Sequence, residues 1–264
     1  MPPRAGARLR RRIAVPVLAL ALAVLAGLAV SAVLLAEPSV PRRHGEPTGA
    51  ADAVGPFGAA PAFASGANPR ALVLDGVSGR LEVTPATGPR ATADFVPDGD
   101  DTPGRVVFGA PGGDGAVPVG CARGDGPSVP CHGVLRLSVP EGTALTVRQT
   151  SGEVSLSGVT GDLDLALTSV RFTAVGVRSG RVALDVRSGS ADVGFASAPG
   201  SLDLDSSSAS VALRLPTGGP GEDYAFTSEA VSADVRIALP DRTDADHRVH
   251  LHTESASVAV LAAG

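Results

Sequence analysis

The chain contains no lysine and no tryptophan, and its 264 residues include only one tyrosine, one methionine and two cysteines. Aromatic residues make up 3% of the sequence, so any hydrophobic core must be built from aliphatic side chains. After residue 36 no stretch has the spacing of an amphipathic helix, and the many glycine, valine and threonine residues argue against one. These absences predict an all-β fold with a thin aliphatic core.

The basic residues are all arginines, 22 in number, and five of them lie within residues 1–12. Without these five, the rest of the chain has 17 basic residues against 27 acidic ones. Such a negatively charged domain lacks the basic face that binding to nucleic acid requires. We therefore expect no nucleic-acid partner, and repulsion from anionic polymers unless cations bridge the two.

One long hydrophobic run covers residues 13–36, where Ser31 is the only strongly polar residue. As a helix this run would be about 36 Å long, enough to cross a hydrocarbon core of about 30 Å. Because arginines precede it and no acidic residue occurs before Glu37, the N-terminus is predicted to be cytoplasmic. We expect a single-pass cell-membrane protein with residues 1–12 inside. The alternative is a cleaved signal peptide, which would export the remaining chain equally.

The exported part begins with a region of little periodicity. Residues 37–69 are rich in proline, alanine and glycine, and we interpret them as a disordered stalk. Residues 70–264 form the predicted extracytoplasmic domain. Within it, residues 85–132 are dense in glycine, proline and aspartate, and they predict a loop-rich insert that only residues 106–108 interrupt.

Both cysteines, Cys121 and Cys131, lie in this insert. Export to an oxidising compartment favours a disulfide between them. A metal site with His132 is the alternative, but two thiols and one imidazole are an incomplete set of ligands for structural zinc. We expect a disulfide, no metal site and no cofactor.

From residue 133 onward, short strands with alternating apolar residues repeat along the chain. Each unit consists of a strand, a corner of small residues, a second strand and a loop. A single unit cannot bury its apolar face alone, so the repetition predicts a β-helix or solenoid-like stack. At the corners, glycine supplies unusual backbone angles and hydroxyl side chains satisfy backbone groups. The matching corner positions, at spacings that grow from 18 to 25 residues, are Gly152, Val170, Gly189, Ala209, Val231 and Ala256.

Three motifs follow one another at the start of the repeats: VPEGT at residues 139–143, SGEV at 151–154 and GVTGDL at 158–163. This succession resembles the putative-adhesin family of bacterial β-strand-repeat domains, a family of unknown function. LDGVSGRLEV at residues 74–83 resembles the opening strand pair of that family. The resemblance implies a β-helix-like fold and an envelope location, often behind one membrane helix, and it brings no catalytic residues. The sequence departs from the family pattern in the cysteine-bearing insert and in TSV, rather than TSG, at residues 168–170.

Charged residues on the repeated strands are the first candidates for a site. Stacked strands could align the aspartates into a ladder that binds calcium or acts on sugars. The alternative is a solvent-facing surface whose charges discourage aggregation and pair with nearby arginines. If Asp164, Asp185 and Asp203 point to different faces, both ladder hypotheses fail. The aspartates are Asp162, Asp164, Asp185, Asp192, Asp203 and Asp205, and the arginines are Arg171, Arg178, Arg181 and Arg187.

Three histidines, His247, His250 and His252, share one segment near the C-terminus. His250 and His252 would project from one strand face and could hold a transition metal, but an outward polar row on a last, capping strand is favoured. No serine has the sequence context of a nucleophile. The sequence therefore predicts a non-catalytic cell-envelope surface module for adhesion, sensing or scaffolding, whose partner is a cell-wall polymer or an envelope protein. The alternative is a carbohydrate-active enzyme or a calcium-dependent polymer binder.

Overall fold

The computed structural model describes residues 63–64, 69–98, 105–122, 128–129, 131–219 and 221–264. The chain divides into two units, residues 1–53 and 54–264, and every described residue belongs to the second. The predicted cytoplasmic tail, the membrane helix of residues 13–36 and most of the stalk lie outside the described residues. Within the described part, no helix is long and apolar enough to cross a membrane.

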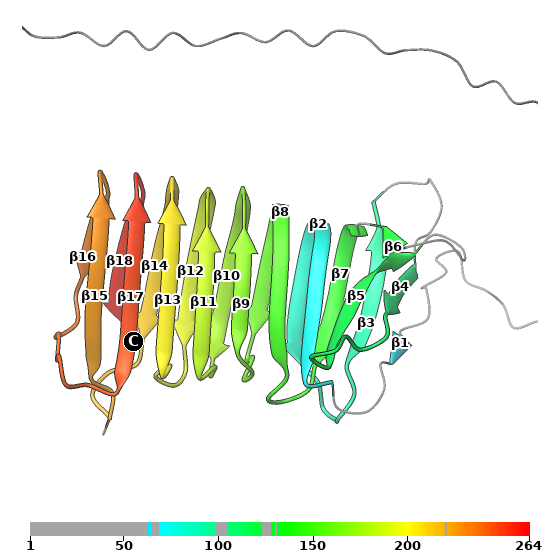
Figure 1. Ribbon diagram of the computed structural model, residues 1–264, viewed down its shortest axis with the longest axis horizontal. Helices are drawn as coiled ribbons and strands as arrows, with labels where there is room; N and C mark the ends of the chain where they lie inside the picture. Colours follow the sequence, from blue (N-terminus) through cyan, green and yellow to red (C-terminus); the bar gives the residue numbers. More distant parts are fainter. Residues whose placement is uncertain (1–62, 65–68, 99–104, 123–127, 130, 220) are drawn as a thin grey trace, which may run out of the picture. The chain divides into compact units, whose positions relative to one another are not determined.

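The described residues contain 18 strands, which confirms the predicted all-β class (Figure 1). The strands up to residue 139 are β1 (Phe63–Ala64), β2 (Ala71–Pro85), β3 (Thr92–Pro97), β4 (Arg105–Phe108), β5 (Ala116–Ala122), β6 (Ser128–Val129) and β7 (Cys131–Val139). The strands of the predicted repeats are β8 (Ala144–Ser157), β9 (Leu163–Leu167), β10 (Val170–Val177), β11 (Arg181–Val186), β12 (Gly189–Phe195), β13 (Ser201–Ser207), β14 (Ala209–Leu215), β15 (Tyr224–Val231), β16 (Asp234–Ile237), β17 (His247–Glu254) and β18 (Ser257–Ala262).

Parallel pairing stacks these strands into two columns that share one core. The first column runs β5, the first half of β2, the first half of β8, then β9, β11, β13, β17 and β15. The second column runs β7, the second halves of β2 and β8, then β10, β12, β14, β18 and β16. One strand of each column, joined at a corner, makes one rung of the stack. The predicted solenoid-like stack is therefore confirmed.

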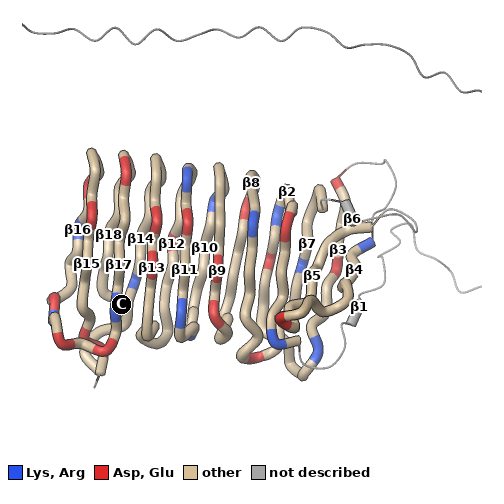
Figure 2. Tube along the Cα trace, viewed as in Figure 1, with Lys and Arg blue, Asp and Glu red and all other residues tan. Residues whose placement is uncertain are grey.

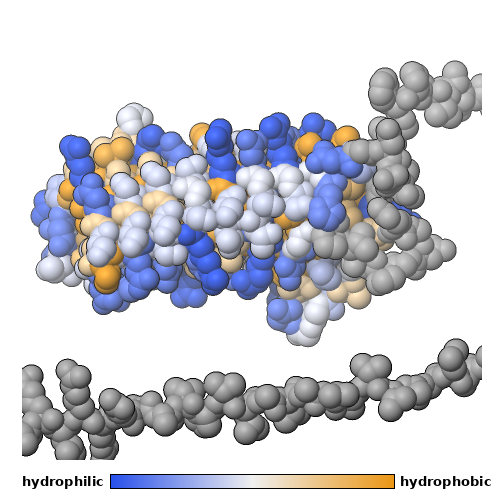
Figure 3. Space-filling model, turned by 90° about the horizontal axis from the view of Figure 1, so that it is seen from above, coloured by the Kyte–Doolittle hydropathy of each residue, from blue (hydrophilic) through white to orange (hydrophobic). Residues whose placement is uncertain are grey.

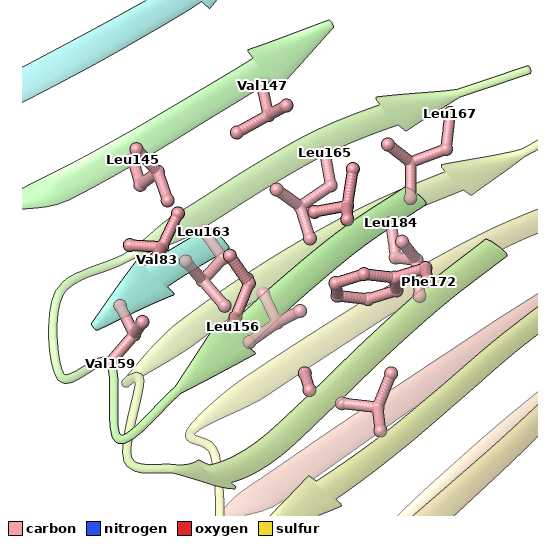
Figure 4. Packing of buried hydrophobic residues seen from close by; sticks show 14 of the residues in the cluster. Val83, Leu145, Val147, Leu156, Val159, Leu163, Leu165, Leu167, Phe172 and Leu184 are labelled. Carbon is pink, nitrogen blue, oxygen red and sulfur yellow. The ribbon is translucent and has the colours of Figure 1, made fainter. Parts of the chain in front are cut away.

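The core lies between the two columns and is built from the alternate residues of each strand. Because the strands pair in register, equivalent side chains form continuous apolar rows along the stack. Figure 4 shows side chains of the two columns meeting around Leu156, Leu165 and Phe172. Each such buried side chain stabilises the fold by about 1.5–3 kcal/mol. One row of the first column is Leu145, Leu163, Val182, Leu202 and Val249, and one row of the second is Val154, Phe172, Ala191, Val211 and Val258, all buried.

The corners use two kinds of backbone geometry. Gly152 and Gly189 turn the chain with φ angles of 101° and 104°, which glycine adopts without a steric penalty. At other corners a serine takes a left-handed conformation just before the matching position, with a φ of 55° at Ser169 and 56° at Ser208. This explains how Val170 replaces glycine in the TSV motif: Ser169 makes the turn, and the Val170 side chain is buried. From above, the corners form part of a pale, weakly polar surface along the stack (Figure 3).

One predicted corner position is wrong by two residues. Val231 pairs with Glu254 rather than with Ala256, and its side chain is 58% exposed. The left-handed serines Ser255 and Ser232 are the equivalent residues, so Ala233 is the residue that matches Ala256. The sequence VSADV fitted the repeat locally, but the shared serine sets the true alignment.

The order of rungs in space differs from their order in the chain. The rung of β17 and β18 lies between that of β13 and β14 and that of β15 and β16. The strand that carries the histidines is therefore internal, and the prediction of a last, capping strand is wrong. The cap is the rung of β15 and β16, whose inward positions at Ser228 and Ala230 are small and exposed.

The insert at residues 85–132 is less loop-like than predicted. Strand β3 pairs antiparallel with β7, and β4 pairs antiparallel with β5, so that these strands extend the two columns at one end of the stack. Cys121 in β5 and Cys131 in β7 form a disulfide with a Cα–Cα distance of 5.1 Å, which links the two columns. The short strands escaped prediction because glycine and proline interrupt their alternation.

Candidate surface groove

A groove of about 410 Å³ crosses the outer face of the first column. We call it the acid–histidine groove. Its floor is made by outward-facing side chains of five consecutive strands, β9, β11, β13, β17 and β15, on which acidic positions recur (Figure 2). The residues that line it are Asp164, Leu165, Ala183, Leu184, Asp185, Asp203, Leu204, Asp205, Thr227, Glu229, His250, Leu251 and His252.

Strand register arranges the polar residues of the groove in two rows that run along the stack. Neighbouring residues in a row are about 4.8 Å apart, and the rows are separated by two residues of strand, about 6.6 Å. The first row is Asp164, Ala183, Asp203, His250 and Thr227. The second row is Ala166, Asp185, Asp205, His252 and Glu229.

Asp164, Asp185 and Asp203 therefore share one face. Their orientation does not reject the hypothesis of an acidic ladder, which would have failed if they pointed to different faces. The ladder is interrupted, however, because Ala183 stands between Asp164 and Asp203 in the first row. Ala183 separates Asp164 from Asp203, whereas Asp185 and Asp205 are direct register partners, so carboxylate repulsion is relieved in the first row and not in the second. Among the described residues, no three side chains of histidine, cysteine, aspartate or glutamate are grouped closely enough to hold a metal ion.

The carboxylates on the β9 and β11 side of the groove are partly neutralised, and those at its centre on β13 are not. Arg148 lies 3.8 Å from Asp164, and Arg187 lies 3.5 Å from Asp185. Asp203 and Asp205 are exposed, and neither forms an ion pair with another residue in the described part of the chain. Two free carboxylates on one rigid strand give the centre of the groove a negative potential and several unused hydrogen-bond acceptors.

His252 joins the two last rungs. Its Nδ1 lies 3.5 Å from Oε2 of Glu229 on β15, and its Nε2 lies 3.7 Å from Oε1 of Glu254 on its own strand. Its register partner on the other side is Asp205. A neutral imidazole has a single N–H to donate, whereas a protonated one could serve both glutamates. His252 thus gives the groove a hydrogen-bond donor among carboxylates that only accept hydrogen bonds.

Other predicted residues lie outside the groove. Asp162 accepts a hydrogen bond from the backbone N–H of Arg181 at 3.1 Å and so shapes a loop. Asp192 is on β12 in the second column, where it pairs with Arg214. Arg171 and Arg178 also lie away from the groove, on β10 and in the loop that follows it. Of the four predicted arginines, only Arg187 pairs with an aspartate of the groove.

His247, the third predicted histidine, has a structural role at the end of β17. Its Nδ1–H donates a hydrogen bond to the Pro199 carbonyl at 2.7 Å, and its ring lies 5.7 Å from that of Tyr224. The hydroxyl of Tyr224 donates to the Pro216 carbonyl at 2.9 Å. Burial raises the pKa of Tyr224 to about 12, and the nearby Glu222 carboxylate adds to this rise.

Thr227 and Glu229 line the groove but were not among the predicted residues. They reach it only because β15 packs beside β17, which the chain order does not suggest. Aligning Ser232 with Ser255 in the sequence would have placed Glu229 level with His252.

The fold and groove define a class: an all-β parallel solenoid with an acidic groove on one outer face. No known protein family matches the chain, and no curated protein matches its sequence. A solved structure described as a putative cell adhesion protein from Clostridium sporogenes is similar at 10% sequence identity and a TM-score of 0.33. The match covers 77% of this chain and 99% of that one. A score this low carries no argument about function.

Proposed function

We propose that this chain is a non-catalytic surface module of the bacterial envelope and that its acid–histidine groove binds a cell-wall polymer. The observation that carries the proposal is the pair of free carboxylates, Asp203 and Asp205, at the centre of a groove spanning five strands. Carboxylates held on neighbouring strands accept hydrogen bonds from hydroxyl and amino groups at regular spacings. A polymer with such groups at repeated intervals fits two rows of acceptors.

The envelope location rests on the sequence. Residues 13–36 would hold the chain in the cell membrane, with residues 1–12 in the cytoplasm and the strands outside. A disulfide between Cys121 and Cys131 is in keeping with an oxidising compartment. From such an anchor the groove would serve adhesion, sensing or scaffolding.

The exposure of the carboxylates supports a binding role over glycosidase chemistry. A glycosidase general acid is a carboxyl kept protonated at working pH, commonly by apolar surroundings. Asp164, Asp203 and Asp205 are instead exposed on an open sheet. None of these three carboxyl groups is buried, whereas the general acid of a glycosidase is usually shielded from water.

The test is a binding assay of the full-length chain, in detergent, on purified cell walls. The variant Asp203→Asn with Asp205→Asn should lower binding about ten-fold or more, because two charge-assisted acceptors worth roughly 1 kcal/mol each are weakened. The control, Asp192→Asn with Glu153→Gln, makes the same charge change on the second column. Equal binding by both variants would overturn the proposal. Binding that requires added calcium would support the calcium-dependent alternative.

A further inference from the structure

The two ends of the stack are built differently. At the insert end, antiparallel strands β3 and β4 cover the last parallel strands. At the opposite end, no described strand pairs with the outer edges of β15 and β16. Hydrophobic side chains are exposed at this end (Figure 3), and several apolar residues there are only partly buried against the core: Phe226, Val235, Ile237 and Leu239.

The edge of β15 is partly covered by its own chain. The backbone N–H of Arg242 donates to the Tyr224 carbonyl at 2.8 Å, and the N–H of Phe226 donates to the Asp241 carboxylate at 3.1 Å. An ion pair of 3.0 Å between Arg242 and Asp223 holds this loop in place. The edge of β16 has no such cover in the described part of the chain.

The hydrogen-bonding groups of β16 alternate between its neighbour and the open edge. The N–H of Asp234 donates to the Ala256 carbonyl, and that of Ala238 donates to the Val260 carbonyl, both at 2.9 Å. Since successive residues of a strand point to opposite sides, the N–H and C=O of Val235 and Ile237 point outward. These groups form a short template for another strand.

We propose that β16 pairs antiparallel with β16 of a second copy of this chain, about a two-fold axis at Val235. In this register the two Val235 residues exchange both backbone hydrogen bonds, with Cα atoms about 5.5 Å apart. Asp234 of each copy then lies opposite Arg236 of the other, in a pair whose side chains are close. The same surface patch serves both copies, as two-fold symmetry requires.

Charge selects this register over its neighbours. A shift that sets Val235 opposite Ile237 places Arg236 of one copy opposite Arg236 of the other, which is a repulsive like-charge contact. A register centred on Ile237 sets Arg236 opposite Ala238 and forms no ion pair. Only pairing about Val235 satisfies the outward backbone groups and all four charges together. Each copy uses its own β16 edge in this contact, so the two-fold contact is closed at two copies.

The test measures the mass of the purified full-length chain in detergent by sedimentation. The wild-type chain should be a dimer. Asp234→Arg and Arg236→Asp should each weaken the dimer about ten-fold or more, because two favourable cross-strand pairs become repulsive. Neither residue is buried, so both variants should keep the fold.

The decisive experiment measures the mass of a mixture of the two variants. Asp234→Arg presents two arginines and Arg236→Asp presents two aspartates, so an equimolar mixture should recover a heterodimer. The double variant, in which the two charges are exchanged, should again form a homodimer. A monomeric wild-type chain, or a dimer that neither reversal weakens, would overturn the proposal.

Discussion

Replacing Gly152 with alanine should cost far more stability than replacing an open glycine with a similar backbone angle. Gly152 is at the corner of β8 with a φ of 101°, where an added Cβ would lie 2.8 Å from the Gly79 carbonyl carbon and closer still to its oxygen. Gly79 cannot move away easily, because β2 is paired with β7 on one side and β8 on the other. Steric overlap therefore adds to backbone strain.

The magnitude follows from a comparison with Gly142. That residue has a φ of 74°, and an added Cβ would have nothing within 4 Å, so Gly142→Ala carries the backbone strain alone, about 1–2 kcal/mol. Gly152→Ala adds overlap with a fixed backbone, which typically costs a further amount of about 1–3 kcal/mol. We expect a total loss of about 2–5 kcal/mol in the free energy of unfolding.

The measurement is urea unfolding of the full-length chain, followed by circular dichroism and by the fluorescence of its single tyrosine. Tyr224 is a clean probe because the chain has no tryptophan. If Gly152→Ala loses no more stability than Gly142→Ala, the tight approach of β2 and β8 at this corner is wrong.

Three further predictions concern the interior. Ser206→Ala with Thr253→Val should raise the free energy of unfolding by about 1–2 kcal/mol in urea, because both hydroxyls are fully buried without a hydrogen-bond partner among the described residues; a loss would mean that they are satisfied. Absorbance at high pH should show Tyr224 ionising near pH 12. Since folding raises that pKa, the associated stability is intact below about pH 10 and is lost as pH rises through 12, and ionisation at the ordinary value would refute this burial. Cys121→Ser with Cys131→Ser should cost about 2–3 kcal/mol; an unchanged urea midpoint would contradict a stabilising disulfide.

The repeated strands could be predicted from the sequence because their information is local. Alternating apolar residues give the inward face, and glycine or serine at fixed distances gives the corners. The outward position of Asp203, Asp205, His250 and His252 follows from the same alternation. None of these inferences requires knowing which strand is the neighbour of which.

The order of rungs could not be predicted, because it depends on contacts between distant residues. The inward residues of β17 and β18 are apolar except for Thr253, and Leu251 and Val260 among them are buried, which suits an internal rung. Those of β15 include Ser228, which suits the end of the stack. The last rung along the chain, β17 and β18, therefore lies further inside the stack than the less apolar rung of β15 and β16 that precedes it in the sequence. The chain order does not reveal that these two rungs are exchanged in space, and it therefore does not reveal that Glu229 lies in the groove.

The proposed dimer has a consequence for the proposed binding function. A two-fold axis normal to the β16 sheet leaves the outer face of the first column pointing the same way in both copies. The two acid–histidine grooves would then be presented side by side to one polymer. When a second site engages the same ligand, overall affinity rises without any new contact, provided that the ligand spans both sites.

This bivalence separates the two proposals experimentally. Arg236→Asp, which leaves the residues of the groove unchanged, should weaken binding to long cell-wall polymer about ten-fold or more, yet leave binding to short fragments unchanged. Asp203→Asn with Asp205→Asn should weaken both, because it alters the groove itself. Binding of long polymer that is insensitive to Arg236→Asp, in a chain shown to be dimeric, would mean that the two grooves do not reach one ligand.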